Sequence, residues 1–410
     1  MHAPLEKKAK GLRIGYLIPQ FPGQTHIFFW RELKELEERG VFVRLFSTRP
    51  PPAGLISHDW SDQAMGQTTY LGKIEPLRAL SGLIMSPWRD VLAERSKAGP
   101  GFLKDVLICL PAARKLIADC KADQISHVHV HSCGRAALIA ALAHRMGGPR
   151  YSVTLHGPMS DYGSGQGYKW RHAEFGTIIT EKLLGEARTE LGADLPSRTP
   201  IQPMGVDPDV FARDTPYTPA KDGEQLRLFA CGRLNVVKGH QDLLSAVRLL
   251  LDQGHDVRVD IAGEDDAGGS GYRAELQAHL ETLNLSANAK LLGAIDADAV
   301  RKHIHTAHVF VLASWHEPLG VAYMEAMASG VPTIGTDAGG VPELIRDGVD
   351  GVLVPPKSPP DLAAAILRVA RDSALAARLS TQGQARITQG FSSARGAETL
   401  IREIQAAGCD

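Results

Sequence analysis

Short apolar runs alternate with longer amphipathic segments along most of the chain. The runs LRIGYLI (12–18) and LRLFAC (226–231) each follow a polar stretch, which is typical of buried strands. Each run leads into a loop and then into a segment with apolar residues at helical spacing, ended by a glycine. A second apolar run follows in each block, at 41–47 and at 257–263. This alternation predicts parallel sheets that helices cover on both faces.

The two blocks predict an α/β protein with two Rossmann-like, doubly wound parallel-sheet domains. A chain of 410 residues is too long for one ordinary core. Residues 197–225 contain five prolines and many turn formers, which makes this segment the best linker candidate. We therefore expect an N-terminal domain over 1–200, a C-terminal domain over 201–390, and a last helix over 391–410 that could return to the N-terminal domain.

The composition predicts a soluble cytoplasmic protein. Hydrophobic residues make up 44% of the chain and charged residues 22%, and no run of 18 apolar residues occurs. The first apolar stretch is too short for a secretory signal. The five cysteines are widely spaced, with no Cys-x-x-Cys pair, which indicates free thiols rather than a zinc site. The stretch 72–118 is rich in Leu, Ile and Val, and we expect its helices to pack in the core rather than dock on a membrane.

The charge is divided unevenly between the two halves. Residues 1–200 contain 26 Lys and Arg against 19 Asp and Glu, a net charge of +7, whereas the remaining residues carry a net charge of −8. A basic half suggests an anionic partner on that side, and a chance distribution of solvated charges is the alternative.

Several common α/β chemistries lack their motifs. Neither first turn has Gly-x-Gly-x-x-Gly, and no Walker pattern occurs, which disfavours a dehydrogenase or a P-loop enzyme. No His, Cys and Asp cluster has metal-ligand spacing. The histidines of HVHVH (127–131) share one face of a strand, and we interpret them as the polar end of a strand near a cleft rather than as a metal site.

The turn after the second block's first strand carries two cations. Arg233 and Lys238 follow the carboxyl end of that strand and precede a helix, where open α/β sheets bind ligands. Two cations beside a helix N-terminus could hold a diphosphate. Solvated loop cations are the alternative.

The segment EPLGVAYMEAMASGVP (317–332) contains two acids in an otherwise apolar context. Glu317 precedes a proline and is therefore extended, and the helix begins near Gly320, so that the N–H groups of Gly320 and Val321 are free. Glu325 lies inside the helix among small apolar neighbours, where it could accept hydrogen bonds from a vicinal diol. Glu317 could accept them from a second polyol, or it could simply complement the helix dipole. Together with the cation pair, this set suits a nucleoside diphosphate sugar.

These motifs resemble those of retaining glycosyltransferases of family 4, which have the GT-B fold with two domains facing a central cleft. The resemblance rests on Glu317-x7-Glu325, on the turn GRL…KG (232–239) and on AGGVPELIRDGVDGVLVPP (338–356). In the first half, FPGQTHIFFWREL (21–33), HVHVH and VTLHG (153–157) are similar to the branch that builds bacterial exopolysaccharide, colanic acid and lipopolysaccharide. GVDPDVF matches that branch's linker.

The resemblance implies a role for each matching residue. Arg233 and Lys238 would bind the donor diphosphate, Glu325 the ribose, and Glu317 the donor sugar. His156 would lie across the cleft near the reacting carbon. The backbone at Leu319, Gly320 and Val321 would meet the sugar and phosphates, and Gly293 the base. The expected catalytic set is therefore His156, Glu317, Arg233 and Lys238.

The resemblance also implies the reaction. A hexosyltransferase-type enzyme would move a sugar from a UDP- or GDP-linked donor to a glycan or lipid-linked acceptor, with retention through front-face displacement and with no metal and no cofactor. Nucleic acid is not an expected partner, whereas peripheral contact with the cytoplasmic face of the inner membrane is. Gly23, Gln24 and Thr25 occupy the acceptor-facing loop, where the branch usually has Ser-Glu-Thr-Phe.

Three other classes stay open at this point. A sugar-nucleotide 2-epimerase or hydrolase of the same fold would need no acceptor, and a non-catalytic nucleotide-sugar-binding protein would carry a signal peptide. A metal-dependent transferase of the other common fold would need Asp-x-Asp after a strand. Asp207-Pro-Asp209 lies in the linker and Asp296-Ala-Asp298 at the start of a helix, so we discount both.

Overall fold

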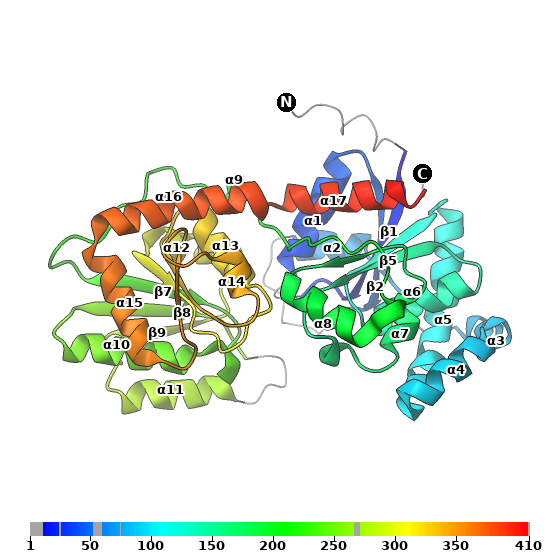
Figure 1. The fold of residues 1–410 in the computed structure, drawn as a ribbon, viewed down its shortest axis with the longest axis horizontal. Coiled ribbons are helices and arrows are strands. Elements are labelled where there is room, and N and C mark those ends of the chain that lie inside the picture. Colours follow the sequence, from blue (N-terminus) through cyan, green and yellow to red (C-terminus); the bar gives the residue numbers. More distant parts are fainter. Residues whose placement is uncertain (1–10, 24–25, 52–59, 74, 266–270, 409–410) are drawn as a thin grey trace. The chain divides into compact units, whose positions relative to one another are not determined.

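The computed structural model places the chain in two compact units (Figure 1). The first unit comprises residues 1–203 and 393–410, and the second comprises 204–392. Their boundary falls inside the proline-rich segment 197–225. The residues whose structure is described are 11–23, 26–51, 60–73, 75–265 and 271–408.

The first unit is built on a parallel sheet of six strands in the order β3-β2-β1-β4-β5-β6. The chain moves outward from β1 to β3, then returns to the other side of β1 and continues to β6, so the sheet is doubly wound. β1 pairs in parallel with both β2 and β4, and the facing pairs include Ile14 with His127. The strands are β1 (Arg13–Gln20), β2 (Phe42–Arg49), β3 (Thr69–Tyr70), β4 (His127–Val130), β5 (Arg150–Leu155) and β6 (Gly176–Ile178).

The helices of the first unit include one from the far end of the sequence. The last helix of the chain packs on the first, where Arg39 lies 3.4 Å from Glu398 and Ser393 Oγ donates to Glu35 at 3.4 Å. The helices are α1 (Ile27–Glu38), α2 (Ser61–Gln67), α3 (Pro76–Met85), α4 (Trp88–Ala98), α5 (Pro100–Ala122), α6 (Arg135–Arg145), α7 (Gln166–Trp170), α8 (Glu181–Leu191) and α17 (Ser393–Ala406).

The second unit repeats the same plan. Its six parallel strands lie in the order β12-β11-β10-β7-β8-β9, so that β7 has β8 on one side and β10 on the other. Leu228, Phe229 and Ala230 are buried at the centre of β7, as expected for a parallel strand covered on both faces. The strands are β7 (Leu226–Cys231), β8 (Val257–Ala262), β9 (Ala289–Gly293), β10 (Val309–Val311), β11 (Thr333–Thr336) and β12 (Val352–Val354).

The helices of the second unit pack on this sheet and on one another. α10 packs on β8 and on α15, and α13 packs on β11 and on α16. The helices are α9 (Pro208–Phe211), α10 (His240–Asp252), α11 (Tyr272–Thr282), α12 (Ala297–Thr306), α13 (Val321–Ala328), α14 (Val341–Leu344), α15 (Pro359–Arg371) and α16 (Ser373–Gly390).

The predicted fold class, two Rossmann-like doubly wound domains, is confirmed. Among the described residues, no helix is both long enough and apolar enough to cross a bilayer. The prediction that the helices of 72–118 pack in the core is wrong for α3, whose large apolar side chains are mostly exposed.

Candidate functional site

The second sheet reverses its strand order between β7 and β10. At such a switch point the loops after the two strands diverge, and ligands of open α/β sheets bind there. The loop after β7 carries Gly232, Arg233 and Lys238, and the loop after β10 carries Glu317. The fold therefore brings three of the predicted site residues to one edge of one sheet.

Lys238 and Glu317 form an ion pair at this edge. The Lys238 ammonium contacts Glu317 Oε2, and Ser314 Oγ lies 3.4 Å from the same oxygen. The pair is mostly enclosed, with 15% of the lysine side chain and 11% of the glutamate side chain exposed. The sequence predicted both residues as ligand contacts, but it did not predict that they pair with each other.

The loops that carry this pair are locked together by further contacts. Trp315 donates its backbone N–H to Val237 O at 2.7 Å and its indole N–H to Asp242 Oδ2 at 2.6 Å. Gly239 has a φ of +66°, and a Cβ at this position would lie 1.9 Å from Ala313 O. Only glycine permits this approach of the two backbones.

The backbone of Glu317 is held from the other side by the loop after β11. Gly340 N–H donates to Glu317 O at 2.9 Å. Gly339 has a φ of +66°, and a Cβ there would lie 2.0 Å from the same carbonyl oxygen. The carboxylate of Glu317 is therefore presented from a backbone that two loops fix.

α13 begins directly after the loop that carries Glu317. Its N-cap is Gly320, at φ +97°, and no side chain among the described residues caps the first turn. Leu319 is buried, and Tyr323 OH donates to Leu312 O at 2.9 Å, which ties the helix to the end of β10.

Glu325 is half-buried on α13, and its charge reaches the end of β7. Burial and, to a smaller extent, the carboxylate of Glu325 together raise the pKa of the Cys231 thiol to about 12. Glu325 therefore lies near the end of β7, and the diol contact that the sequence predicted stays a prediction.

Arg233 follows β7 and Gly293 ends β9, and β8 lies between these two strands. Arg233 is exposed on the loop after β7. Gly293 ends β9 with φ +77°, and its carbonyl accepts a hydrogen bond from Gly263 N–H at 2.9 Å. Sequence reasoning missed the ion pair beside it, in which Arg273 Nη1 lies 2.6 Å from Glu264 Oε2. The two residues are nine positions apart, and no motif links them.

Sequence reasoning also missed His240, the first residue of α10. Its side chain is buried against the turn at Gly232, and burial lowers its pKa to about 4. The neutral imidazole of His240 therefore packs against the Gly232–Arg233 turn. Its position directly after Lys238 and Gly239 was the available signal.

In the first unit, the interpretation of HVHVH as a polar strand end is wrong for the first two histidines. His127 and His129 are fully buried in β4. Each ring lies within 2.7–2.8 Å of the Ser152 hydroxyl of β5, and His129 also contacts Thr154 Oγ1 at 2.8 Å. Burial lowers the pKa of both, to about 3 for His127. The neighbouring strand supplies the hydroxyl partners that make these buried histidines tolerable.

The third histidine belongs to a chain of polar groups that ends at His156. Tyr16 OH donates to Glu32 Oε2 at 2.6 Å, and the same oxygen lies 3.2 Å from His131 Nε2. On the other side of its ring, His131 Nδ1 lies 3.3 Å from His156 Nε2. Burial holds the pKa of His156 well below its ordinary value. His131 therefore lies between the Glu32 carboxylate and the His156 ring.

The predicted acceptor-binding residues are Gly23, Gln24 and Thr25. Gly23 O accepts a hydrogen bond from His26 N–H at 3.0 Å, whereas Gln24 and Thr25 lie outside the described residues. Within the part of the chain that the structure describes, no group of three His, Cys, Asp or Glu could hold a metal ion.

Both Asp-x-Asp sequences have local structural roles. Asp207 accepts from the N–H groups of Asp209 and Val210, and Asp296 accepts from Ala299 N–H at 2.7 Å. Each first aspartate is thus the N-cap of a helix, which agrees with discounting them as metal ligands.

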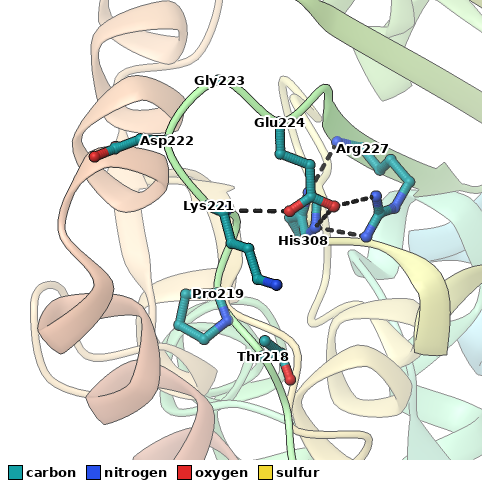
Figure 2. A pocket seen from close by; sticks show the side chains of 8 residues that line it. All are labelled: Thr218, Pro219, Lys221, Asp222, Gly223, Glu224, Arg227 and His308. Atoms are coloured by element: carbon teal, nitrogen blue, oxygen red, sulfur yellow. Dashed lines mark hydrogen bonds and ion pairs between the residues drawn. The ribbon is translucent and has the colours of Figure 1, made fainter.

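A cavity of about 460 Å³ lies at the opposite edge of the second sheet, next to the beginning of β7 (Figure 2). Glu224 accepts from Lys221 N–H at 3.1 Å and from Arg227 at 2.7 Å, and the bond from Arg227 lowers its pKa to about 2. His308 joins the same cluster through Arg227 at 2.6 Å. Glu224, Arg227 and His308 thus bind one another and connect the segment 197–225 to the sheet, so we do not assign a ligand to this cavity.

Most of the second unit, residues 215–386, matches the family model of glycosyl transferases group 1. The match includes Arg233, Lys238, Gly293, Glu317 and Glu325, so the edge described above lies inside the matched domain.

Curated relatives match over part of their length. An uncharacterized glycosyltransferase of Methanocaldococcus jannaschii is 34% identical over 152 residues, which cover 37% of each chain. The amylovoran biosynthesis glycosyltransferase AmsK of Erwinia amylovora is 31% identical over 180 residues, which cover 42% of each chain. The chain thus spans well under two thirds of the length of these relatives.

The fold resembles solved structures over nearly the whole chain. The Anabaena protein HepE in complex with UDP and glucose superposes with a TM-score of 0.73 and 17% identity, covering 96% of this chain and 100% of that one. The GT-B architecture of the two units, predicted from the sequence, is therefore confirmed at the level of the fold.

Proposed function

We propose that this chain is a retaining glycosyltransferase of family 4. It would transfer a hexose from a UDP- or GDP-linked donor to a glycan or lipid-linked acceptor during the assembly of bacterial surface polysaccharide. The relative named for amylovoran biosynthesis and the fold relative that was solved with UDP and glucose support this choice of substrates.

The observation that carries the proposal is the enclosed Lys238–Glu317 pair at the switch point, beside the uncapped start of α13. An ammonium and free helix N–H groups suit a diphosphate, and a carboxylate fixed by two loops suits sugar hydroxyls. When a diphosphate binds Lys238, Glu317 is released to accept hydrogen bonds from the sugar. The Lys238–diphosphate contact and the Glu317–sugar contact are thereby coupled. A nucleotide without a sugar would contact Lys238 but not Glu317.

The other residues complete this arrangement. Arg233 adds charge on the diphosphate, Glu325 accepts from the ribose hydroxyls, and the base lies near the backbone of Gly293. The backbone of Leu319, Gly320 and Val321 adds main-chain contacts. In the first unit, a neutral His156 offers one ring nitrogen to the reacting sugar or the acceptor, and Gly23 belongs to the acceptor side with Gln24 and Thr25.

The reaction follows from charge placement. Cleavage of the glycosidic bond to the diphosphate leaves negative charge on the leaving oxygen, which Lys238, Arg233 and the start of α13 stabilise. That leaving group takes the proton of the acceptor hydroxyl as the new bond forms on the same face of the sugar. Two cations would replace the metal ion that other transferases use, so we propose a metal-independent enzyme.

The basic first half of the chain suggests an anionic acceptor, and we propose a lipid-linked diphosphate sugar at the cytoplasmic face of the inner membrane. Salt would weaken attraction to that surface.

Thermal-shift screening against UDP, GDP and their sugars tests the donor. A ligand that binds only the native state raises the unfolding temperature by mass action. We expect one nucleotide series to shift the unfolding temperature strongly. The absence of a shift with every nucleoside diphosphate would contradict the proposal.

Sugar transfer in excess EDTA tests the reaction. We expect transfer from the identified donor to continue at an unchanged rate. Complete loss that Mn²⁺ restores would exclude metal independence, and release of the free sugar and the nucleotide without any acceptor product would favour the epimerase or hydrolase alternative.

A further inference from the structure

α3 presents its apolar side chains to solvent. Leu77 is 83% exposed and Ile84 is 74% exposed, and Leu80, Leu83 and Met85 are also exposed. The described residues expose fourteen large apolar side chains in all, and eight of them lie on α3, α4 and α5. We call the five exposed residues of α3 the α3 face.

The packing of α3 explains why this face points outward. α3 rests on α5 through Gly82, where an added Cβ would lie 3.1 Å from Leu110 Cβ and 3.3 Å from Leu110 O. Leu77, Leu80 and Ile84 follow one another at i, i+3 and i+7, so they share a stripe away from Gly82. The small residue thus faces the protein and the large apolar residues face away from it.

The α3–α5 region is also basic. These three helices contain eight Lys and Arg but only four Asp and Glu. The acids are engaged: Asp90 contacts Arg145, Glu94 lies 3.1 Å from Arg171, Asp105 2.8 Å from Arg135, and Asp119 2.7 Å from Lys115.

Several cations of the same helices remain available. Arg89, Arg95, Lys97 and Lys104 are exposed, and none of them forms an ion pair with another described residue. In Figure 1, α3 and α4 lie together at the outer edge of the first unit, beside α5. Apolar side chains and uncompensated positive charge therefore occur on neighbouring helices.

We propose that the α3 face inserts into the surface of an anionic lipid bilayer, with the exposed cations of α4 and α5 on the lipid headgroups. α3 has ten residues, too few to cross a bilayer, which suits a helix that lies in the interface. The surplus of cations favours an anionic surface over a second copy of this face, because two such faces would repel each other. This surface specifies how the proposed lipid-linked acceptor is reached, and in that respect it rests on the proposed function.

Co-sedimentation with vesicles tests the proposal without requiring activity. The full chain is mixed with vesicles of phosphatidylcholine alone, or of phosphatidylcholine with phosphatidylglycerol, at low and high salt. We expect binding to the anionic vesicles that weakens with salt, and at least a tenfold weaker partition for the double variant Leu80→Glu with Ile84→Glu. The matched control, Val210→Glu with Val349→Glu, changes two exposed apolar side chains of the second unit and should bind like the wild type.

Three results would overturn the proposal: no binding of the wild type to anionic vesicles at low salt, equal binding of the α3 variant and the control, or a dimer that the α3 variant converts to a monomer. Because the altered side chains are exposed, thermal unfolding and nucleotide binding should be unchanged in both variants. Nucleotide binding that persists while vesicle binding fails would reject the surface and leave the proposed function standing.

Discussion

At the scale of single residues, the ion pair between Lys238 and Glu317 gives Glu317 a role different from that of Glu325. Their loops are 79 residues apart in sequence, and only the order of the strands brings them together. The candidate residues could be predicted from the sequence motifs, and Glu317, Glu325, Arg233 and Lys238 all lie within the matched residues 215–386. Their pairing could not be predicted, because the pattern of a sequence does not record which side chains meet across a sheet edge.

The first prediction concerns the division of labour between the acids. Glu325→Ala should lower the affinity for free UDP or GDP by about ten- to a hundredfold, because the loss of a hydrogen bond to a charged group costs ~1.5–3 kcal/mol. Glu317→Ala should leave free-nucleotide affinity intact or increased, since it frees Lys238, but should lower turnover. Calorimetric titration and donor kinetics measure the two effects. An equal loss of nucleotide affinity in both variants would show that this division is wrong.

The second prediction concerns Glu32, which is buried and lies 3.2 Å from His131, the neighbour of His156. Glu32→Gln removes the charge that orients His131, so we expect turnover to fall roughly tenfold while nucleotide affinity stays constant. The pH profile of turnover should also differ from that of the wild type, because a negative charge is removed next to the His131–His156 pair. Glu38→Gln, at the exposed end of the same helix, is the control. Identical kinetics and pH profiles in the two variants would remove His131 from the mechanism.

At the scale of elements, the strands were the most predictable feature. The runs 12–18, 41–47, 226–231 and 257–263 correspond to β1, β2, β7 and β8, because a strand buried on both faces must be apolar throughout. The environment of β4 was not predictable, since its histidines depend on hydroxyl groups of the next strand. α3 was misjudged because an apolar stripe does not reveal whether anything covers it.

The third prediction concerns the loop that positions Glu317. Gly339→Ala places a Cβ against Glu317 O and demands a left-handed conformation that alanine rarely adopts, so we expect a loss of stability of about 1–3 kcal/mol and a larger loss of turnover. Gly185→Ala, at an exposed helical position with open space around it, should instead stabilise the protein by roughly 0.5–1 kcal/mol. Urea unfolding and donor kinetics distinguish them. A Gly339→Ala variant as stable and active as the wild type would show that this backbone contact is dispensable.

At the scale of the whole molecule, both units contain buried histidines that the folded state keeps neutral. The folded-state pKa is about 3 for His127 and about 4 for His240, both lowered chiefly by burial. Above the unfolded-state pKa of ~6.5 these groups do not affect stability. As pH falls below that value, the unfolded chain takes up protons that the folded chain refuses, so stability is lost from about pH 6.5 down towards 4.

The fourth prediction follows from this sign. At pH 5 each such histidine should destabilise the fold by about 2 kcal/mol relative to pH 8. The midpoint of urea unfolding, measured at pH 8, 6.5 and 5, should therefore fall slightly over the first interval, as stability drops by roughly 0.4 kcal/mol per histidine, and clearly over the second. A midpoint that stays constant between pH 6.5 and pH 5 would contradict the neutral, buried state of these rings.

We propose that the switch-point edge of the second unit binds a nucleoside diphosphate through Lys238. Calorimetric titration of the full chain with UDP and with GDP, in the absence of metal ions, measures this binding. We predict saturable binding of at least one nucleotide at one site per chain, and an affinity at least tenfold lower in Lys238→Ala. Failure of both nucleotides to bind the wild type, or equal affinity in the variant, would contradict the account.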